Sequence, residues 1–179
     1  MIRTLVALSL LTVGAIASAQ EQSGTDLAQS AVGFGFRLGA FLPADSRVRD
    51  VATTFIDFGI EYDFEKSVFK NGTTYIAGDW ISPSLLGGQH LATFTVNQRF
   101  YTKNQRFAVG GSPYFYAGIG GEWLHAAGNS SDMTWVVRGG LGSEFQGDYF
   151  VELGGSFSPK VGGVNGSGAS VSVGYRFKD

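Results

Sequence analysis

Hydrophobic and polar residues alternate with a period of two along most of the chain, in eight segments separated by residues that favour turns. This alternation is typical of β-strands with one apolar and one polar face. It predicts strands at 32–42, 54–64, 73–82, 91–101, 114–124, 134–145, 149–157 and 169–177. An even-numbered antiparallel meander removes its exposed edges by closing. We therefore expect an all-β fold, an eight-stranded antiparallel up-and-down barrel.

The two faces of these strands differ in chemistry. One face carries sixteen Phe, Tyr or Trp side chains and no charged residue. The other face carries eleven charged residues: Arg37, Asp57, Glu61, Asp63, Asp79, Arg99, Glu122, Arg138, Glu144, Glu152 and Arg176. Alternation alone does not decide which face is inside, because a soluble barrel would place the apolar face inward and a membrane barrel would do the reverse.

Side-chain volume decides in favour of the membrane barrel. The interior of an eight-stranded barrel is just wide enough for ordinary side chains to fill it. Sixteen large rings would overfill that space, and overpacking is destabilising. The charged face holds ten glycines, which leave room for long arginine and glutamate side chains. The sequence thus predicts a transmembrane barrel with a polar lumen, and a soluble exported barrel is the alternative.

This orientation has consequences for both faces. Buried charges must be paired, so we expect Arg37, Arg99, Arg138 and Arg176 to form ion pairs among Asp57, Glu61, Asp79, Glu122, Glu144 and Glu152. This set is expected to be a structural lumen charge network, while Asp63 stays hydrated near a barrel mouth. On the outer face, Trp80, Trp123 and Trp135 are expected to belong to an aromatic girdle at the membrane interface.

The first nineteen residues have the pattern of a secretory signal peptide. The basic start "MIR" precedes an apolar run and the small residues "ASA", which predicts cleavage after Ala19. A membrane-anchoring helix is the alternative reading of this segment. Residues 20–31 form a polar N-terminal leader, and residues 32–179 are expected to be the outer-membrane β-barrel domain.

Composition excludes several classes of site. The formal charge of −2 gives no indication of a nucleic-acid partner. The chain has no cysteine, which rules out disulfides, zinc–thiolate sites and thiol nucleophiles. Glycine is abundant, at 27 residues, as expected for a β-rich chain and not for a helical bundle. Two distant histidines do not make a transition-metal site, so neither a metal nor another cofactor is expected.

Two segments resemble small eight-stranded outer-membrane β-barrels of the OmpA/OmpX/OmpW-like kind. They are "SPYFYAGIGGEW" at 112–123, a Pro–aromatic run followed by Gly-x-Gly, and "VSVGYRF" at 171–177. The second is similar to the last-strand signal read by the barrel assembly machinery, with Tyr175 and Phe177 as its aromatic residues. Here Lys178 and Asp179 follow, whereas the family usually ends on the aromatic residue. The resemblance implies an outer-membrane location, with membrane lipid, lipopolysaccharide and the assembly machinery as partners.

An enzymatic barrel is the less favoured alternative. Some eight-stranded barrels modify lipid A, and a deacylase would need a His–Ser pair and a carboxylate on the outer wall. His125 has the right position, but residue 127 is alanine and Ser131 is expected to lie in a loop, as is His90. We therefore expect a non-enzymatic protein with a structural or surface-interaction role. A narrow conduit for small apolar molecules and a soluble ligand-binding barrel are the alternatives.

Overall fold

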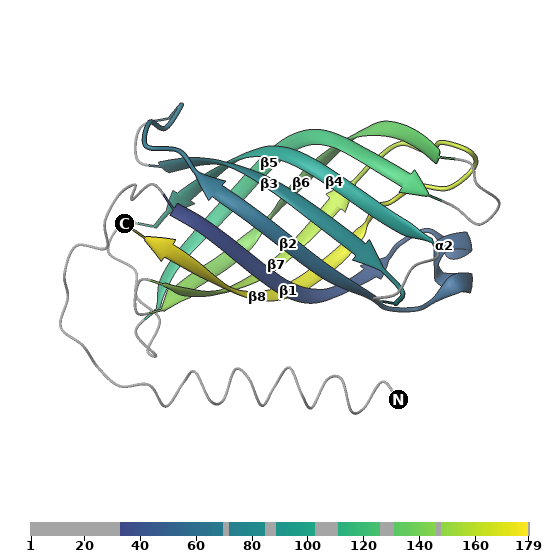
Figure 1. The fold of residues 1–179 in the computed structure, drawn as a ribbon, viewed down its shortest axis with the longest axis horizontal. Coiled ribbons are helices and arrows are strands. Elements are labelled where there is room, and N and C mark those ends of the chain that lie inside the picture. The colour runs from purple at the N-terminus through teal and green to yellow at the C-terminus, as the bar shows by residue number, and fades with distance from the viewer. Residues whose placement is uncertain are drawn as a thin grey trace.

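The chain folds into a closed β-barrel. The computed structural model describes residues 33–69, 72–84, 89–102, 111–125, 131–145 and 148–178, so the predicted signal peptide and leader lie outside the described residues. Eight antiparallel strands follow one another around the barrel in chain order (Figure 1). They are β1 (Gly33–Pro43), β2 (Phe55–Asp63), β3 (Gly72–Ser82), β4 (His90–Tyr101), β5 (Ser112–His125), β6 (Ser131–Phe145), β7 (Tyr149–Phe157) and β8 (Gly168–Lys178). The predicted eight-stranded up-and-down barrel is confirmed.

The barrel closes where its first and last strands pair. The β1–β8 ladder runs from Gly33 opposite Lys178 to Pro43 opposite Gly168. The start of β1 and the end of β8 therefore lie at one end of the barrel, which we call the terminal end. The β1–β2, β3–β4, β5–β6 and β7–β8 connections lie at the opposite end, which we call the α2 end.

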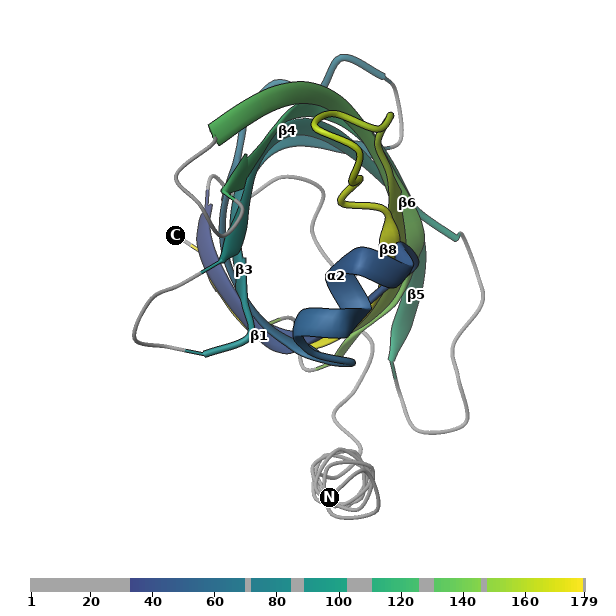
Figure 2. The same cartoon turned by 90° about the vertical axis from the view of Figure 1, so that its right-hand side faces the viewer.

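A short helix, α2 (Ser46–Val51), lies across the α2 end of the barrel (Figure 2). The sequence analysis treated this segment as a loop, because six residues are too few to establish a helical period. Its signal is local: Asp45 is the N-cap, and its side chain accepts a hydrogen bond from the Arg47 backbone N–H at 2.9 Å. Among the described residues, no helix has the length and apolarity required to span a membrane.

Strand boundaries agree with the predicted ones to within three residues. The largest differences are at β5 and β6, which start at Ser112 and Ser131. The β5–β6 ladder continues to Ser112 opposite Glu144 at one end and His125 opposite Ser131 at the other. Cross-strand hydrogen bonding thus extends strand structure into residues that the sequence analysis assigned to loops, and Ser131 and His90 both lie in strands.

The burial pattern is that of an inside-out protein. The guanidinium-bearing residues Arg37, Arg99 and Arg176 are at most 2% exposed, although they are among the most polar residues of the chain. Large apolar side chains cover the outer surface instead, including Phe36, Leu38, Phe58, Ile60, Trp80, Phe94, Val96, Ile119, Trp123, Trp135, Leu141, Leu153 and Phe157. The prediction that the charged face of each strand points into the lumen and the apolar face points outward therefore matches the structure.

The lumen also contains aromatic rings that the sequence analysis did not place there. Phe41, Phe55, Tyr75, Tyr114, Tyr116 and Phe150 are all buried and have the same strand parity as the charged residues. Several inward glycines make room for these rings. A methyl group on Gly142 would collide with Tyr114, and one on Gly174 would collide with Phe150. The predicted role of the glycines, to accommodate arginine and glutamate, is therefore only part of their role.

Candidate functional site

The centre of the lumen is organised around Glu61, a β2 residue that contacts three arginines. Its Oε2 accepts a hydrogen bond from Arg37 Nη1 at 3.3 Å, and its Oε1 accepts one from Arg99 Nη2 at 2.8 Å. Arg176 Nε also donates to Oε1. These arginines come from β1, β4 and β8, so one carboxylate joins four strands across the barrel. Arg176 belongs to β8, which pairs with β1 where the barrel closes. The contact between Arg176 and Glu61 therefore depends on barrel closure.

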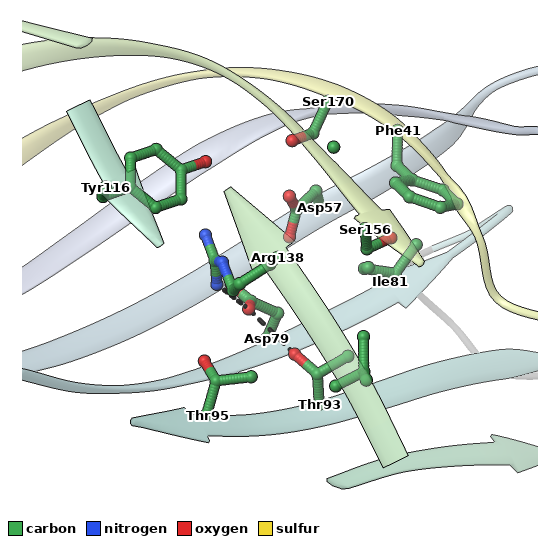
Figure 3. Close-up of a pocket in the computed structure, with 12 residues that line it drawn as sticks. Phe41, Asp57, Asp79, Ile81, Thr93, Thr95, Tyr116, Arg138, Ser156 and Ser170 are labelled. Carbon is green, nitrogen blue, oxygen red and sulfur yellow. Dashed lines mark hydrogen bonds and ion pairs between the residues drawn. The ribbon is translucent and has the colours of Figure 1, made fainter. Parts of the chain in front are cut away.

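Asp79 on β3 forms a second centre. It accepts hydrogen bonds from Arg138 Nη1 at 2.7 Å and from Thr93 Oγ1 at 2.9 Å (Figure 3). It also accepts one from Arg37 Nη2. Arg37 thus bridges Asp79 and Glu61, which links the two centres into one network. The residue of β2 beside Asp79 must be small, because a Cβ at Gly59 would collide with both Asp79 and Arg37.

The network continues toward the terminal end of the barrel. Arg99 Nη1 lies 3.0 Å from Asp63 Oδ2, while Arg176 lies 3.3 Å from Glu144 and 3.5 Å from Glu152. Asp63 was expected to be hydrated. It is instead buried, because Arg99 occupies the lumen beside it. Charge pairing therefore extends from the middle of the lumen to its terminal end.

Tyrosine hydroxyls and aromatic faces complete the surroundings of the charges. Tyr101 donates to Glu144 at 2.5 Å, and Tyr114 donates to Glu152 at 2.9 Å. The guanidinium carbon of Arg99 lies 4.3 Å from the centre of the Tyr75 ring, and that of Arg176 lies 3.7 Å from the Phe150 ring. These are cation–π distances. The available signal in the sequence was that these aromatic residues alternate in step with the charged residues and so point inward. The sequence analysis did not use this signal.

Two predicted members take no part in the ion pairs found among the described residues. Asp57 is buried and its Oδ1 has no hydrogen-bond partner, although it lines a small cavity of about 30 Å³ together with Asp79 and Arg138 (Figure 3). Glu122 lies at the α2 end beside Ser158 and Gly166. The structure therefore joins Arg37, Arg99, Arg138 and Arg176 with Glu61, Asp79, Glu144 and Glu152, and it adds Asp63. We call these nine residues the lumen charge network.

The network can fix and neutralise charge, but its geometry does not indicate catalysis. Each carboxylate of the lumen charge network accepts a hydrogen bond from an arginine or a tyrosine and is buried. Within the described part of the chain, no group of three or more His, Asp or Glu residues is arranged to hold a metal ion. The chemistry of the lumen is thus that of a filled, charge-paired interior.

A histidine–serine pair lies at the rim of the α2 end. The Nδ1 atom of His125 is 2.9 Å from Ser131 Oγ, and the His125 ring stacks on His90, with centroids 4.8 Å apart. His90 in turn stacks on Trp80. The expectation that Ser131 lies in a loop is therefore wrong, since β6 begins at Ser131. Nucleophilic catalysis would also require a third group that orients the histidine by a hydrogen bond. The contact of His90 with the His125 ring is a stacking contact instead.

Aromatic residues gather on the outer face near both ends. Trp80, Trp123 and Trp135 all lie in the half of the barrel toward the α2 end, and each is about half exposed. Near the terminal end, Phe100 stacks on Phe115, and Tyr175 contacts both Tyr149 and Phe177. Tyr175 and Phe177, the residues of the predicted assembly signal, therefore point outward within this second group of rings.

Among the solved structures that share this fold are three bacterial proteins. Neisserial surface protein A aligns with a TM-score of 0.58 at 12% identity, over 84% of this chain and 98% of that chain. The Yersinia pestis outer membrane protein Ail, in a phospholipid bilayer nanodisc, gives 0.53 at 14% identity, over 82% and 99%. The N-terminal β-barrel domain of Pseudomonas aeruginosa OprF gives 0.50 at 12% identity, over 83% and 100%.

The likeness is one of structure and not of sequence. No protein-family model matches the chain, and no curated protein matches its sequence. At 12–14% identity the comparisons show the fold alone. The resemblance inferred from "SPYFYAGIGGEW" and "VSVGYRF" is confirmed at that level: the chain has the fold of small eight-stranded outer-membrane β-barrels.

Proposed function

We propose that this chain is a non-enzymatic outer-membrane barrel with a structural or surface-interaction role. The observation that carries the proposal is the inverted burial. Four arginines and five carboxylates of the lumen charge network are enclosed, while rings and aliphatic side chains cover the wall. A soluble protein rarely exposes a contiguous apolar surface of this kind, whereas a barrel in lipid requires one.

The aromatic groups near the two ends support a membrane-spanning orientation. Tyr and Trp rings favour the interface between hydrocarbon and water, and here they flank aliphatic residues such as Ile60, Leu141 and Leu153. The strands, of 9 to 15 residues, are long enough to cross a bilayer when tilted. In this orientation the four connections at the α2 end face outside, and the predicted signal peptide directs export.

The wall supplies the proposed partners. Membrane lipid contacts its aliphatic middle, and lipopolysaccharide contacts the rim around Trp80 and Trp123. The last strand would present Tyr175 and Phe177 to the barrel assembly machinery. Phe177 is 52% exposed on the outer face, so a second protein can reach it during insertion.

The filled lumen favours a structural role over the conduit hypothesis. The cavity beside Asp57 has room for about one water molecule, and the ion pairs around Glu61 and Asp79 lie across the axis. A conduit for apolar molecules would need an apolar path through this region. Refolded protein in a planar bilayer should therefore show no steady single-channel conductance, and a stable open level would favour the conduit.

Fractionation and a gel assay test the membrane proposal directly. The protein expressed with its first nineteen residues should appear in the outer-membrane fraction, and the folded form should migrate differently before and after boiling. Leu153→Arg, on the wall, should impair insertion, because a charge facing lipid is destabilising. Lys160→Glu, in the β7–β8 connection, is the control and should insert normally. Recovery of the wild-type protein in the soluble periplasm would overturn the proposal.

The absence of an enzymatic role is tested at the histidine–serine pair. Ser131→Ala and His125→Ala should leave envelope lipid composition unchanged when the wild-type and variant proteins are expressed at equal levels. Loss of an acyl chain from lipid A that depends on both side chains would instead show that the pair is catalytic.

A further inference from the structure

We propose that the α2 end of the barrel contains a binding site for a small amphipathic anion, a carboxylate with an apolar body of about six to eight carbons. The site is an open cavity of about 170 Å³ between α2, the starts of β2 and β4, the end of β5 and the β7–β8 connection. Arg47, Val48 and Val51 of α2 form one side of it. Figure 2 shows α2 lying over this mouth of the barrel.

The floor of the cavity is apolar. Phe55, Leu91 and Leu124 line it and belong to a buried hydrophobic cluster at this end of the lumen. Val48 and Val164 pack against the same cluster from α2 and from the β7–β8 connection. Water in such a cavity meets few polar partners, so an apolar group that displaces it is favoured.

The rim of the cavity is polar and carries a positive charge. Gln89, His90, His125 and Arg47 line it, and Arg47 supplies a formal positive charge. None of the described residues that line the cavity is a carboxylate, although carboxylates crowd the lumen below. An anionic head group is therefore attracted to the rim, while a cationic one is repelled.

Arg47 is held in place by the β7–β8 connection. Its Nη1 donates to the Gly163 carbonyl oxygen at 3.1 Å. Gly162 and Gly163 adopt positive φ angles of 59° and 87° in the turn between Val161 and Val164. Among the described residues the Arg47 guanidinium has no second hydrogen bond or ion pair, so its other N–H groups can bind a carboxylate, which arginine binds well.

Size and depth restrict the ligand. A cavity of about 150 Å³ holds a benzene-sized group, so the 170 Å³ available suits a short acyl or aryl body. Beneath the floor lie Phe41 and Ile81, which belong to the same buried cluster, and then the ion pairs of Asp79. The ligand therefore binds at the mouth and is not conducted through the barrel.

Methyl NMR of the barrel in lipid nanodiscs tests the proposal with sodium hexanoate as the probe. Saturable shifts are expected for the methyl groups of Val48, Val51, Leu91, Leu124 and Val164, with a Kd on the order of millimolar for so small a ligand. Hexanol and hexylammonium should bind more weakly, by about threefold or more, since one partly exposed charge contributes about that factor. Shifts confined to the lipid-facing methyls of Leu141 and Leu153 would show partition into the bilayer and would overturn the site.

Three variants separate the contribution of charge from that of shape. Arg47→Gln should raise the hexanoate Kd by about threefold or more while leaving the hexanol Kd unchanged. Arg49→Gln makes the same charge change two residues away, on an exposed residue outside the cavity lining, and should have no effect. Val51→Trp fills the cavity from an exposed position and should abolish the Leu91 and Leu124 shifts.

Folding of each variant is checked by its heat-dependent gel mobility. Equal hexanoate affinities for Arg47→Gln and Arg49→Gln would contradict an anion site, and so would stronger binding of hexylammonium than of hexanoate. Unchanged binding to Val51→Trp would place the ligand elsewhere. The assay requires a barrel that folds in lipid, which the gel mobility checks separately, so a failure of the binding site is distinguishable from a failure of the membrane proposal.

Discussion

The two ends of the lumen are filled by different chemistry, although inward positions of β1, β2, β3 and β4 contribute to both. From the middle to the terminal end, arginines and carboxylates pair around Glu61 and Asp79. Toward the α2 end, Phe41, Phe55, Ile81, Leu91 and Leu124 form an apolar cluster, covered in part by α2. Strand parity thus determines which residues face inward, but it does not determine what kind of interior they build.

The comparison suggests that the two regions respond differently to mutation. In the charge network, removing one partner leaves buried charges behind, so a small chemical change has a large effect. In the apolar cluster, the loss scales with the volume removed and with how far the neighbours can relax. Four substitutions, in order of decreasing expected effect, test this difference.

Glu61→Gln should cause the largest loss of stability. It leaves Arg37, Arg99 and Arg176 without their shared partner, and breaking a buried pair typically costs about 3–5 kcal/mol. Urea unfolding in lipid vesicles, followed by gel mobility, measures the free energy of unfolding. Glu65→Gln, on an exposed residue beyond β2, is the matched control and should change it by less than about 0.5 kcal/mol. Equal effects of the two variants would mean that the network does not stabilise the barrel.

Leu124→Ala should destabilise the barrel by about 2–4 kcal/mol, because it leaves a void in the apolar cluster. Leu153→Ala removes the same atoms from a wall residue that is 62% exposed within the chain. Lipid can fill the space that it leaves, so a smaller loss is expected in the same unfolding assay. A larger loss for Leu153→Ala would show that the cluster at the α2 end is not well packed.

Gly174→Ala should cost about 1–3 kcal/mol by overpacking, since the added methyl group collides with the Phe150 ring and the Phe36 carbonyl oxygen. Gly78→Ala faces outward, where an added Cβ would make only ordinary contacts. It should be close to neutral. Thermal shifts of gel mobility compare the two variants, and a neutral Gly174→Ala would show that the lumen near Phe150 is loose.

Asp45→Ala should have the smallest effect, about 1 kcal/mol, and a local one. It removes the N-cap of α2 and a second hydrogen bond, from the Asn165 backbone N–H at 3.3 Å. Hydrogen exchange should accelerate in residues 46–52 and not in the strands. Asp50→Ala, on an exposed residue of the same helix, is the control. Faster exchange throughout the barrel would mean that α2 supports the whole fold.

The sequence sufficed for strand direction, strand number and the identity of the inward charges. These features follow from a local period of two, which each strand repeats independently. Which charged side chains of the lumen form ion pairs was less predictable, because this depends on the register of the strands around the closed barrel. Arg176 and Glu61, for example, are 115 residues apart and meet only through the β1–β8 seam. Asp57 and Glu122 were expected to pair with arginine, and neither forms an ion pair with the residues that the structure describes.

The α2 end was the region that sequence reasoning missed most. A six-residue helix has no measurable period. The apolar inward residues Ile81, Leu91 and Leu124 lie within the predicted strands, but the sequence analysis described the inward face only by its charges and glycines. The Asp45 cap and the Gly162–Gly163 pair were the available local signals. They define a turn and a helix start, but not the cavity that these elements enclose.

The contact between Arg176 and Glu61 also bears on how a newly made chain reaches this fold. Glu61 belongs to the second strand and Arg176 to the last, so synthesis of the acidic partner precedes that of the basic one by most of the chain. Until the final eleven-residue strand is in place, the acid lacks one of its three cations and the first strand has an open edge. A truncated polypeptide therefore carries two defects at one position, and the arrival of the last strand corrects both together.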